Sequence, residues 1–260
     1  MSTGRSSRKL ALVMVGLPAR GKTYTAKKLA RYLLWLGHNA QVFNVGNYRR
    51  NRLGAHQTHD FFDPNNPAGA SARRELAMEA LDDMLDWLRE TGDVAIYDAT
   101  NSTRERRTRV REQCEKAGMQ VLFIETLCDD AAVIEQNIRS TKLAMPDYEG
   151  LEPEAAVADF RARIAHYEEA YETVGDDEGS YIKLIDVGRQ IQVNRLDGYL
   201  AGRKFVAGDQ LTIGDIAFGP VVYLVQSVPF DRPKLANYDA WYARISERPA
   251  FKKVVALPVA

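Results

Sequence analysis

The sequence contains little cysteine and histidine and no long apolar run. Its 260 residues include two cysteines, Cys114 and Cys128, and four histidines without metal-ligand spacing. Two cysteines do not make the disulfide framework of a small secreted domain. No apolar stretch could span a bilayer, and residues 1–9 lack the apolar core of a signal peptide. We therefore expect reduced thiols, no zinc site, no membrane contact and a cytoplasmic location.

Net charge is also absent. Lysine plus arginine and aspartate plus glutamate number 35 each, so the formal charge at pH 7 is zero. No overall field draws such a chain to nucleic acid, and we expect no nucleic-acid partner. Local basic clusters then indicate sites for small anions. With 45% hydrophobic residues, the chain can form one large domain or a domain with an appendage.

The sequence does contain a phosphate-binding loop of the form G-x-x-x-x-G-K-[ST], directly after the apolar run at residues 10–15. Its members are Gly16, Leu17, Pro18, Ala19, Arg20, Gly21, Lys22 and Thr23. Backbone N–H groups of such a loop, and the start of the helix after it, face anionic oxygens. Lys22 would reach the β- and γ-phosphates, and the Thr23 hydroxyl would hold Mg²⁺. We count Tyr24, the next residue, with the nucleotide-binding set.

Short apolar runs alternate with longer helical patterns up to residue 187. The runs predict strands at residues 10–15, 41–45, 94–97, 121–126 and 182–187. The patterns between them predict helices at residues 22–36, 72–89, 103–116, 131–140 and 154–172, and a loop at 63–69. We therefore predict an α/β fold, a parallel sheet of the P-loop NTPase type with helices on both faces.

The alternation ends after residue 188. Residues 193–260 predict helices only, and residues 212–215 resemble a capping box that opens an apolar helix. We predict an all-α extension from about residue 195.

Asp98 directly follows the predicted strand at residues 94–97. Ligands of open α/β sheets lie beyond the carboxyl ends of the strands, so this carboxylate is expected to face the same crevice as the phosphate loop. There it could hold the hydration shell of Mg²⁺ or take a proton from an attacking hydroxyl. The alternative is an aspartate that only caps a helix.

Arginines gather near the same edge of the predicted sheet. The helix that opens with the apparent capping box at residues 102–105 carries arginines at its positive end, which costs stability unless an anion lies between them. We expect one or two of the arginines at 104–107 to face the crevice and Arg109 and Arg111 to form a solvated face. Further clusters lie at residues 48–52 and at Arg73 and Arg74. Each alone is typical of plain surface charge, but with the loop they suggest an acceptor that bears a phosphate.

Five blocks in one order resemble the kinase domain of the bifunctional 6-phosphofructo-2-kinase/fructose-2,6-bisphosphatase family. They are GLPARGKT at 16–23, NVGNYRR at 44–50, DATNSTRERR at 98–107, KLAMPDY at 142–148 and SYIKLIDVG at 180–188. The resemblance extends from Lys9 to about Arg195. It implies transfer of the γ-phosphoryl group of MgATP to the 2-hydroxyl of fructose 6-phosphate, with ATP and Mg²⁺ as cofactors.

The resemblance also implies roles for single residues. Around the sugar phosphate it puts Arg49, Arg73, Thr100, Arg106, Lys142, Arg163 and Tyr167. It places residues from Asn137 to Lys142 along the nucleotide, and Asp98 and Cys128 in the active site beside Lys22. The spacing of four residues also puts Arg163 and Tyr167 on one face of a helix. A thiol has no evident duty in phosphoryl transfer, so we interpret Cys128 as a wall residue of the crevice.

The C-terminal residues depart from that family. They resemble the latter half of the helical domain of glutathione transferases, without the half that would bind glutathione. None of the four histidines lies in the Arg-His-Gly signature that a histidine-phosphatase domain would need. We predict a disordered segment at 1–8, a kinase domain at 9–195 and a helical extension at 196–260. About sixty residues form only a marginal core, so the extension is expected to pack on the kinase or on a second copy in a homodimer.

Two other functions stay open at this point. The chain could be a P-loop kinase for another phosphorylated small molecule. It could also be a nucleotide-dependent binding module that recruits a partner through its helical tail.

Overall fold

The computed structural model describes residues 9–35, 37–142, 145–186, 190–194, 204–205, 211, 215, 219, 222–223 and 235–254. The predicted N-terminal segment at 1–8, the domain boundary near 195 and most of the capping box at 212–215 lie outside these residues. No helix in the described part is long and apolar enough to cross a membrane.

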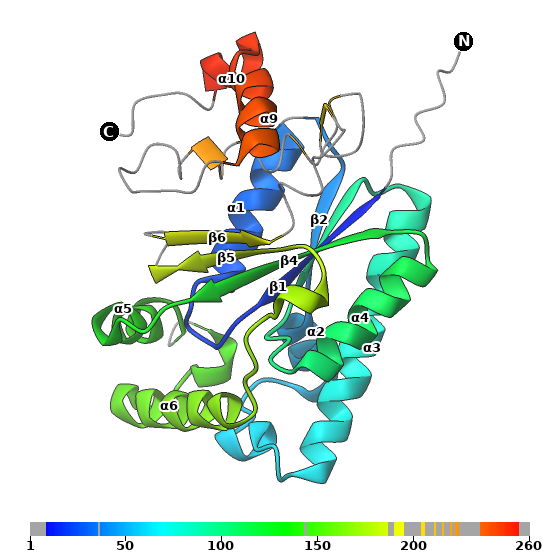
Figure 1. Ribbon diagram of the computed structural model, residues 1–260. Helices are drawn as coiled ribbons and strands as arrows, with labels where there is room; N and C mark the ends of the chain where they lie inside the picture. Colours follow the sequence, from blue (N-terminus) through cyan, green and yellow to red (C-terminus); the bar gives the residue numbers. More distant parts are fainter. Residues whose placement is uncertain are drawn as a thin grey trace.

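Within the described residues, six strands form one sheet in the order β2-β3-β1-β4-β5-β6 (Figure 1). Neighbouring strands are parallel except for the antiparallel pair β5 and β6. The strands are β1 Leu10–Val15, β2 Ala40–Asn44, β3 Val94–Asp98, β4 Gln120–Leu127, β5 Tyr181–Ile185 and β6 Gln190–Asn194. The predicted α/β fold is confirmed, with one antiparallel edge strand added.

Helices cover both faces of this sheet. The α-helices are α1 Lys22–Trp35, α2 Val45–Leu53, α3 Pro67–Glu90, α4 Arg104–Lys116, α5 Ala131–Asn137, α6 Pro153–Glu169, α9 Ala236–Ser246 and α10 Pro249–Val254. Short 3₁₀ helices in the described part include η1 His59–Phe62, η3 Pro146–Tyr148 and η4 Asp176–Glu178, and η2 Ile138–Lys142 is π-helical. In Figure 1, α1 lies on one side of the sheet and α3 and α4 lie on the other.

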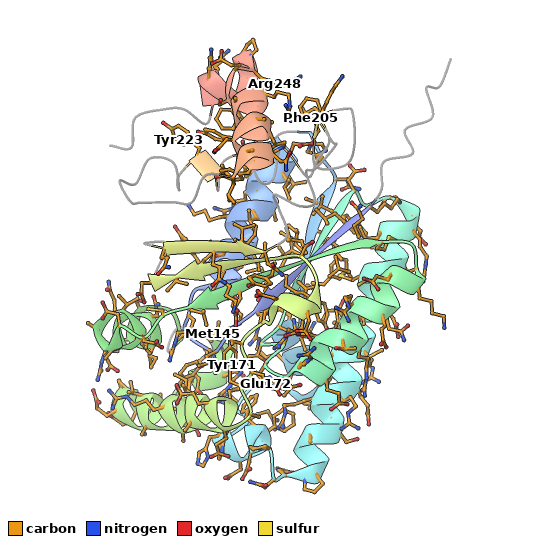
Figure 2. All side chains as sticks on the ribbon, viewed as in Figure 1. Met145, Tyr171, Glu172, Phe205, Tyr223 and Arg248 are labelled. Carbon is orange, nitrogen blue, oxygen red and sulfur yellow. The ribbon has the colours of Figure 1, made fainter. Side chains whose placement is uncertain are left out.

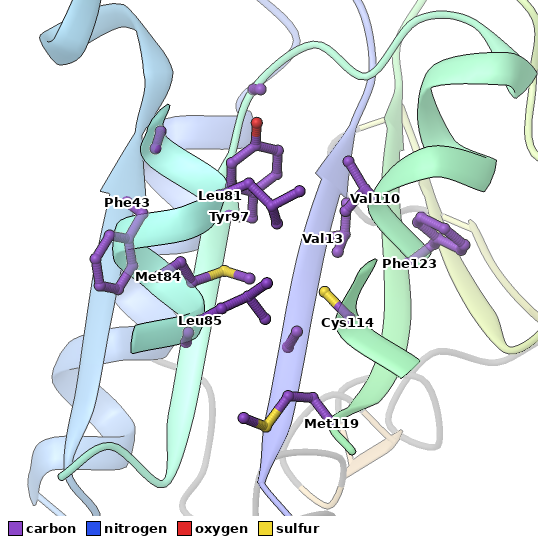
Figure 3. Packing of buried hydrophobic residues seen from close by; sticks show 14 of the residues in the cluster. Val13, Phe43, Leu81, Met84, Leu85, Tyr97, Val110, Cys114, Met119 and Phe123 are labelled. Carbon is purple, nitrogen blue, oxygen red and sulfur yellow. The ribbon is translucent and has the colours of Figure 1, made fainter. Parts of the chain in front are cut away.

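The two faces of the sheet are apolar because both are buried. On one face, Val13 and Phe123 pack against Met84 of α3 and Cys114 of α4 (Figure 3). On the other, residues of β1 and β3 such as Leu12 pack against the small residues and Leu33 of α1. Burial raises the pKa of the Cys114 thiol to about 12, so this cysteine stays a neutral packing residue.

A further apolar cluster joins the C-terminal helices to the sheet. Trp241 and Ile245 of α9 pack with Ile182 of β5, and Leu122 and Leu184 contact both this cluster and the core beneath α1. Figure 2 shows Phe205 and Tyr223 in the same region as α9. The described part of the extension therefore packs on the sheet, and packing on a second copy stays a prediction.

Several predicted boundaries are wrong for local reasons. Residues 67–69 begin α3, because Pro67 occupies its first turn and the Asn66 side chain accepts a hydrogen bond from the Gly69 N–H. Arg73 therefore lies in the second turn of α3. The N-cap of α4 is Thr103, whose side chain accepts a hydrogen bond from the N–H of Arg106. Ser102 therefore does not begin the capping box that the sequence suggests.

Other elements differ from the expected pattern. The segment after β2 folds as α2, α5 ends at Asn137 and continues as η2, and α6 ends at Glu169. Residues 190–194 form β6 where helices alone were expected from residue 193. Their polar and apolar residues alternate, and this pattern suits an edge strand paired with β5.

Candidate active site

The phosphate-binding loop joins β1 to α1 at the carboxyl end of the sheet. Gly16 has φ +137°, and a Cβ there would lie 2.5 Å from the carbonyl oxygen of Thr126, so only glycine fits against β4. Gly21 has φ +84° and Ala19 has φ +60°. The Lys22 side chain is buried, and its Nζ donates to the Leu17 carbonyl at 2.5 Å. The loop therefore has the curled backbone and inward lysine that a polyphosphate requires.

The loop is braced from the side of α5 and α6. Ala19 packs in an apolar cluster with residues of α5, η3 and α6, and its carbonyl accepts a hydrogen bond from Asn137 Nδ2 at 3.0 Å. Arg20 Nη2 lies 3.3 Å from Glu168 Oε1 at the end of α6. Tyr24 is 68% exposed. The Lys142 backbone lies in η2, but its side chain is outside what the structure describes.

Asp98 ends β3 and is 2% exposed. Asn44, its register partner at the end of β2, donates from Nδ2 to Asp98 Oδ2. The chain beyond Asp98 stays close to the loop, because the N–H of Gly16 donates to the Thr100 carbonyl at 3.0 Å. Asn101 Nδ2 also donates to the carbonyl of Met14 in β1 at 2.7 Å. The structure thus places the Asp98 segment and the phosphate loop side by side.

Oxygen ligands at this edge suit Mg²⁺. A magnesium ion is commonly held by one or two protein oxygens together with substrate phosphates and water, and the Thr23 hydroxyl and the Asp98 carboxylate are of that kind. The described residues contain no group of three or more His, Cys, Asp or Glu side chains that could hold a metal ion. The donor set therefore fits a nucleotide-bound Mg²⁺.

A second cluster, the arginine cluster, consists of Arg49 of α2, Arg73 of α3, Arg106 of α4 and Arg163 of α6. Arg49 is 4% exposed and forms an ion pair with Asp147 through Nη2. Among the described residues, nothing accepts a hydrogen bond from Nε or Nη1 of Arg49 or from Nε of Arg163. Buried guanidinium N–H groups without partners are costly unless an anion binds them.

The charges within the arginine cluster affect one another. Burial lowers the pKa of Arg73, and the positive charges of Arg106 and Arg163 lower it further. Burial opposes ionisation of Asp147, but its hydrogen bond with Arg49 and the charges of that residue, Arg163 and Arg50 outweigh this and lower its pKa. Asp147 is therefore a carboxylate, and the arginine cluster keeps a net positive charge.

Most of the residues that were expected around the sugar phosphate lie close together. The structure brings together Arg49, Arg73, Arg106 and Arg163, and Tyr167 lies near Phe62 at a ring-centre distance of 6.0 Å. Arg106 Nε donates to Asn101 Oδ1 at 3.2 Å, which ties the cluster to the Asp98 segment. Cys128 follows β4 and is 5% exposed, and its role as a wall residue of the crevice stays a prediction.

The neighbours of Arg106 have other roles. Arg107 is fully buried and binds Glu178 through Nε and Nη2 at 2.7 and 2.8 Å. Arg104 pairs with Asp177 at the surface. Arg109 pairs with Glu105, as a solvated residue would, but Arg111 is half-buried and donates to the Glu178 carbonyl, so its predicted exposure is wrong.

A buried polar network supports the sheet behind the loop. Glu125 of β4 is the register partner of Val15, and its carboxylate accepts from the Tyr171 hydroxyl at 2.5 Å and lies 3.2 Å from Lys183 Nζ. Figure 2 shows Tyr171 and Glu172 between α6 and the sheet. This network fixes the segment after α6, and hence α6, against the sheet.

Sequence reasoning missed three residues of this region, Asn44, Phe62 and Asp147. Asn44 and Asp147 lie in blocks that signalled the family resemblance, but nothing local indicated that they hold Asp98 and Arg49. Phe62 lies in a segment without periodicity, and only its adjacent aromatic partner Phe61 marked it as unusual.

Comparisons with known proteins identify the family of this chain. Residues 1–206 match the family model described as 6-phosphofructo-2-kinase, and residues 188–249 match that of the glutathione S-transferase C-terminal domain. Proteins named 6-phosphofructo-2-kinase/fructose-2,6-bisphosphatase from Arabidopsis thaliana and Gallus gallus are 52% and 45% identical to this chain over 204 and 196 residues. A probable 6-phosphofructo-2-kinase of Schizosaccharomyces pombe is 43% identical over 209 residues.

These matches cover 76%, 74% and 78% of this chain but only 27%, 42% and 31% of the three relatives. The chain thus spans less than half the length of the curated relatives that it matches. A family model that matches most of the chain leads to one conclusion. The chain belongs to the 6-phosphofructo-2-kinase family.

Proposed function

We propose that this chain transfers the γ-phosphoryl group of MgATP to the 2-hydroxyl of fructose 6-phosphate. The observation that carries the proposal is the arginine cluster, whose buried N–H groups lack partners within the described residues and which a hydrogen bond links to the Asp98 segment. A loop for one polyphosphate and a separate site for a second anion suit a donor and a phosphorylated acceptor.

In this reaction the O2 atom of the sugar forms a bond to the γ-phosphorus, and the bond from that phosphorus to the β,γ-bridging oxygen breaks. ADP leaves, and the hydroxyl proton is lost. Lys22 and the loop N–H groups hold the phosphates, while the arginine cluster orients the sugar through its 6-phosphate. Mg²⁺, which the Thr23 hydroxyl would hold, would neutralise phosphate charge. Asp98 either contributes to that site or accepts the hydroxyl proton.

The product of this reaction is fructose 2,6-bisphosphate. The 260 residues contain no Arg-His-Gly sequence, so we propose that they form this product without hydrolysing it by histidine-phosphatase chemistry.

The test is an assay of the purified chain with MgATP and fructose 6-phosphate. We expect ADP and an acid-labile bisphosphate in equal amounts, with the new phosphate mapped to O2 by ³¹P NMR. Lys22→Met is the matched control, because it removes the cation that faces the γ-phosphate. Product no higher than in this control would overturn the proposal.

A panel of other phosphorylated acceptors separates the alternatives in the same assay. Faster turnover with another acceptor would identify a different small-molecule kinase. ATP binding without transfer to any acceptor would identify a binding module.

A further inference from the structure

The short helix η1 lies between α3 and α6 and is fixed from both. The N–H of His59 donates to Asp159 Oδ1 at 2.9 Å, and its Nδ1 lies 3.2 Å from Nε2 of His166. From α3, Arg73 donates through Nη1 to the Phe61 carbonyl. The position of η1 therefore depends on the two helices that also carry Arg73 and Arg163.

Two aromatic rings of η1 contact three residues of the arginine cluster. Phe62 is 4% exposed, and its ring centre lies 3.6 Å from Cζ of Arg163 and 5.5 Å from Cζ of Arg49. The ring centre of Phe61 lies 5.7 Å from Cζ of Arg73, and the two rings meet edge to face at 5.1 Å. Phe62 thus lies beside both arginines whose N–H groups have no acceptor among the described residues.

An aromatic face is a different partner from a carboxylate. The ring attracts the guanidinium through its quadrupole and contacts the flat face of that group. A carboxylate would bind the N–H edge and neutralise the charge, as Asp147 does on one edge of Arg49. Beside the Phe62 ring, by contrast, Nε and Nη1 of Arg49 and Nε of Arg163 have no acceptor among the described residues.

We propose that Phe62 is a positioning residue of the acceptor site. Its ring holds Arg49 and Arg163 in place without using their N–H groups, so that these remain available to the phosphate group of the acceptor. The identity of the acceptor as a sugar phosphate rests on the proposed function. The effect of the ring on anion affinity does not.

The experiment compares Phe62→Leu with the wild type. Leucine keeps an apolar side chain but removes the aromatic face. We expect the KM and the calorimetric Kd for fructose 6-phosphate to rise about tenfold, because both arginines lose their stacking partner. The kcat and the KM for ATP should stay within about twofold, because the contacts described for the Phe62 ring are with Phe61, Tyr167, Arg49 and Arg163.

Two further variants make the result specific. Phe62→Tyr keeps the ring and should bind fructose 6-phosphate within about twofold of the wild type. Phe123→Leu makes the same substitution at a core position that is 1% exposed, and it should lower stability without changing the Kd. If Phe62→Leu does not fold, Phe62→Met takes its place as the variant without a ring. Unchanged affinity without the ring, or an equal loss in Phe62→Tyr or Phe123→Leu, would overturn the proposal.

Inorganic phosphate serves as a second probe that requires no turnover. If the wild type binds it but transfers no phosphoryl group to fructose 6-phosphate, the proposed function fails, and the Kd ratio of the Phe62 variants still decides the role of the ring. If transfer occurs and the ring has no effect on Kd, only the role of Phe62 fails. Absence of binding of both probes overturns both proposals.

Discussion

Asn44 connects two parts of the site through one side chain. Its Oδ1 accepts a hydrogen bond from the Asn47 N–H at 3.0 Å and so caps α2, the helix that carries Arg49. Its Nδ2 donates to Asp98, the buried carboxylate at the end of the neighbouring strand. In the proposed reaction, this donor fixes which oxygen of Asp98 is left for the substrate or for Mg²⁺.

Substitution of Asn44 by serine separates these two roles. Serine is as good an N-cap as asparagine, but its hydroxyl cannot make both contacts. We expect kcat with fructose 6-phosphate to fall about ten- to a hundredfold, with KM and melting temperature little changed, because only the orientation of Asp98 is lost. Steady-state kinetics and thermal melts measure this.

The matched control is Asn66→Ser at the cap of α3, where the side chain has no contact with Asp98. An equal loss of kcat in the control, or an unchanged kcat in Asn44→Ser, would refute the role of Asn44.

Among the elements, α4 is held in place by one buried ion pair. Arg107 of α4 binds Glu178 of η4 in a bidentate manner and also donates to the Glu172 carbonyl at 2.7 Å. Burial opposes ionisation of Glu178, but the hydrogen bonds from Arg107 and from the Gly175 N–H outweigh it and lower its pKa. Arg106 directly precedes Arg107 on α4, so the Arg107–Glu178 pair also sets the position of one member of the arginine cluster.

The pair predicts a pH dependence of stability. A glutamate whose pKa is lower in the folded than in the unfolded chain stabilises the fold fully above about pH 4.3, and this contribution disappears as the pH falls through the folded-state pKa. We expect Glu178→Gln to lower the free energy of unfolding by about 3–5 kcal/mol at pH 7, because Arg107 is left buried without its counter-charge. Below about pH 4 the difference from the wild type should shrink.

Urea unfolding at several pH values measures this difference. Glu112→Gln on the exposed side of α4 is the control and should change stability by no more than about 0.5 kcal/mol at any pH. If the free energy of unfolding of Glu178→Gln stays below that of the wild type by the same amount down to pH 2, the Arg107–Glu178 ion pair is not the source of the difference.

At the scale of the whole molecule, the C-terminal helices and the sheet share apolar residues. Trp241 is fully buried, and its Nε1 donates to Asp215 Oδ1 at 2.6 Å. The same cluster includes Ile182 and Leu184 of β5, the strand that pairs with β4 beside the phosphate loop. The helical extension is thus part of the covering of the kinase sheet, on the face that α1 also covers.

We therefore predict that Trp241→Ala destabilises the kinase part as well as the helices. Its free energy of unfolding should fall by about 3–5 kcal/mol, in one calorimetric transition that an ATP analogue shifts to higher temperature. Trp35→Ala, at a position 61% exposed, should have little effect. The contrary result is two separate transitions, one shifted only by the ATP analogue and the other shifted only by Trp241→Ala. It would show that the two parts unfold independently.

Patterns of neighbouring residues were enough to predict strands β1 to β5, the position of the phosphate loop and the position of Asp98 at the end of β3. They succeeded because strand periodicity, the two loop glycines and the order strand, loop, helix are all local properties. The same reasoning failed at β6 and at residues 67–69, where a short edge strand and a capped proline differ little from loops in composition. It also did not predict which of the adjacent arginines at 104–107 would face the crevice.

The sequence by itself determined the phosphate-binding edge of an α/β sheet and a surplus of arginines near it. The tertiary structure decided which arginines meet. Arg106 joins the arginine cluster while Arg107 is neutralised by Glu178, 71 residues further along the chain. Arg49 and Arg163 are brought to the ring of Phe62 from two different helices. Such pairings depend on contacts between distant segments, and no local pattern encodes them, because the free energy of a buried charge depends on its partner in space.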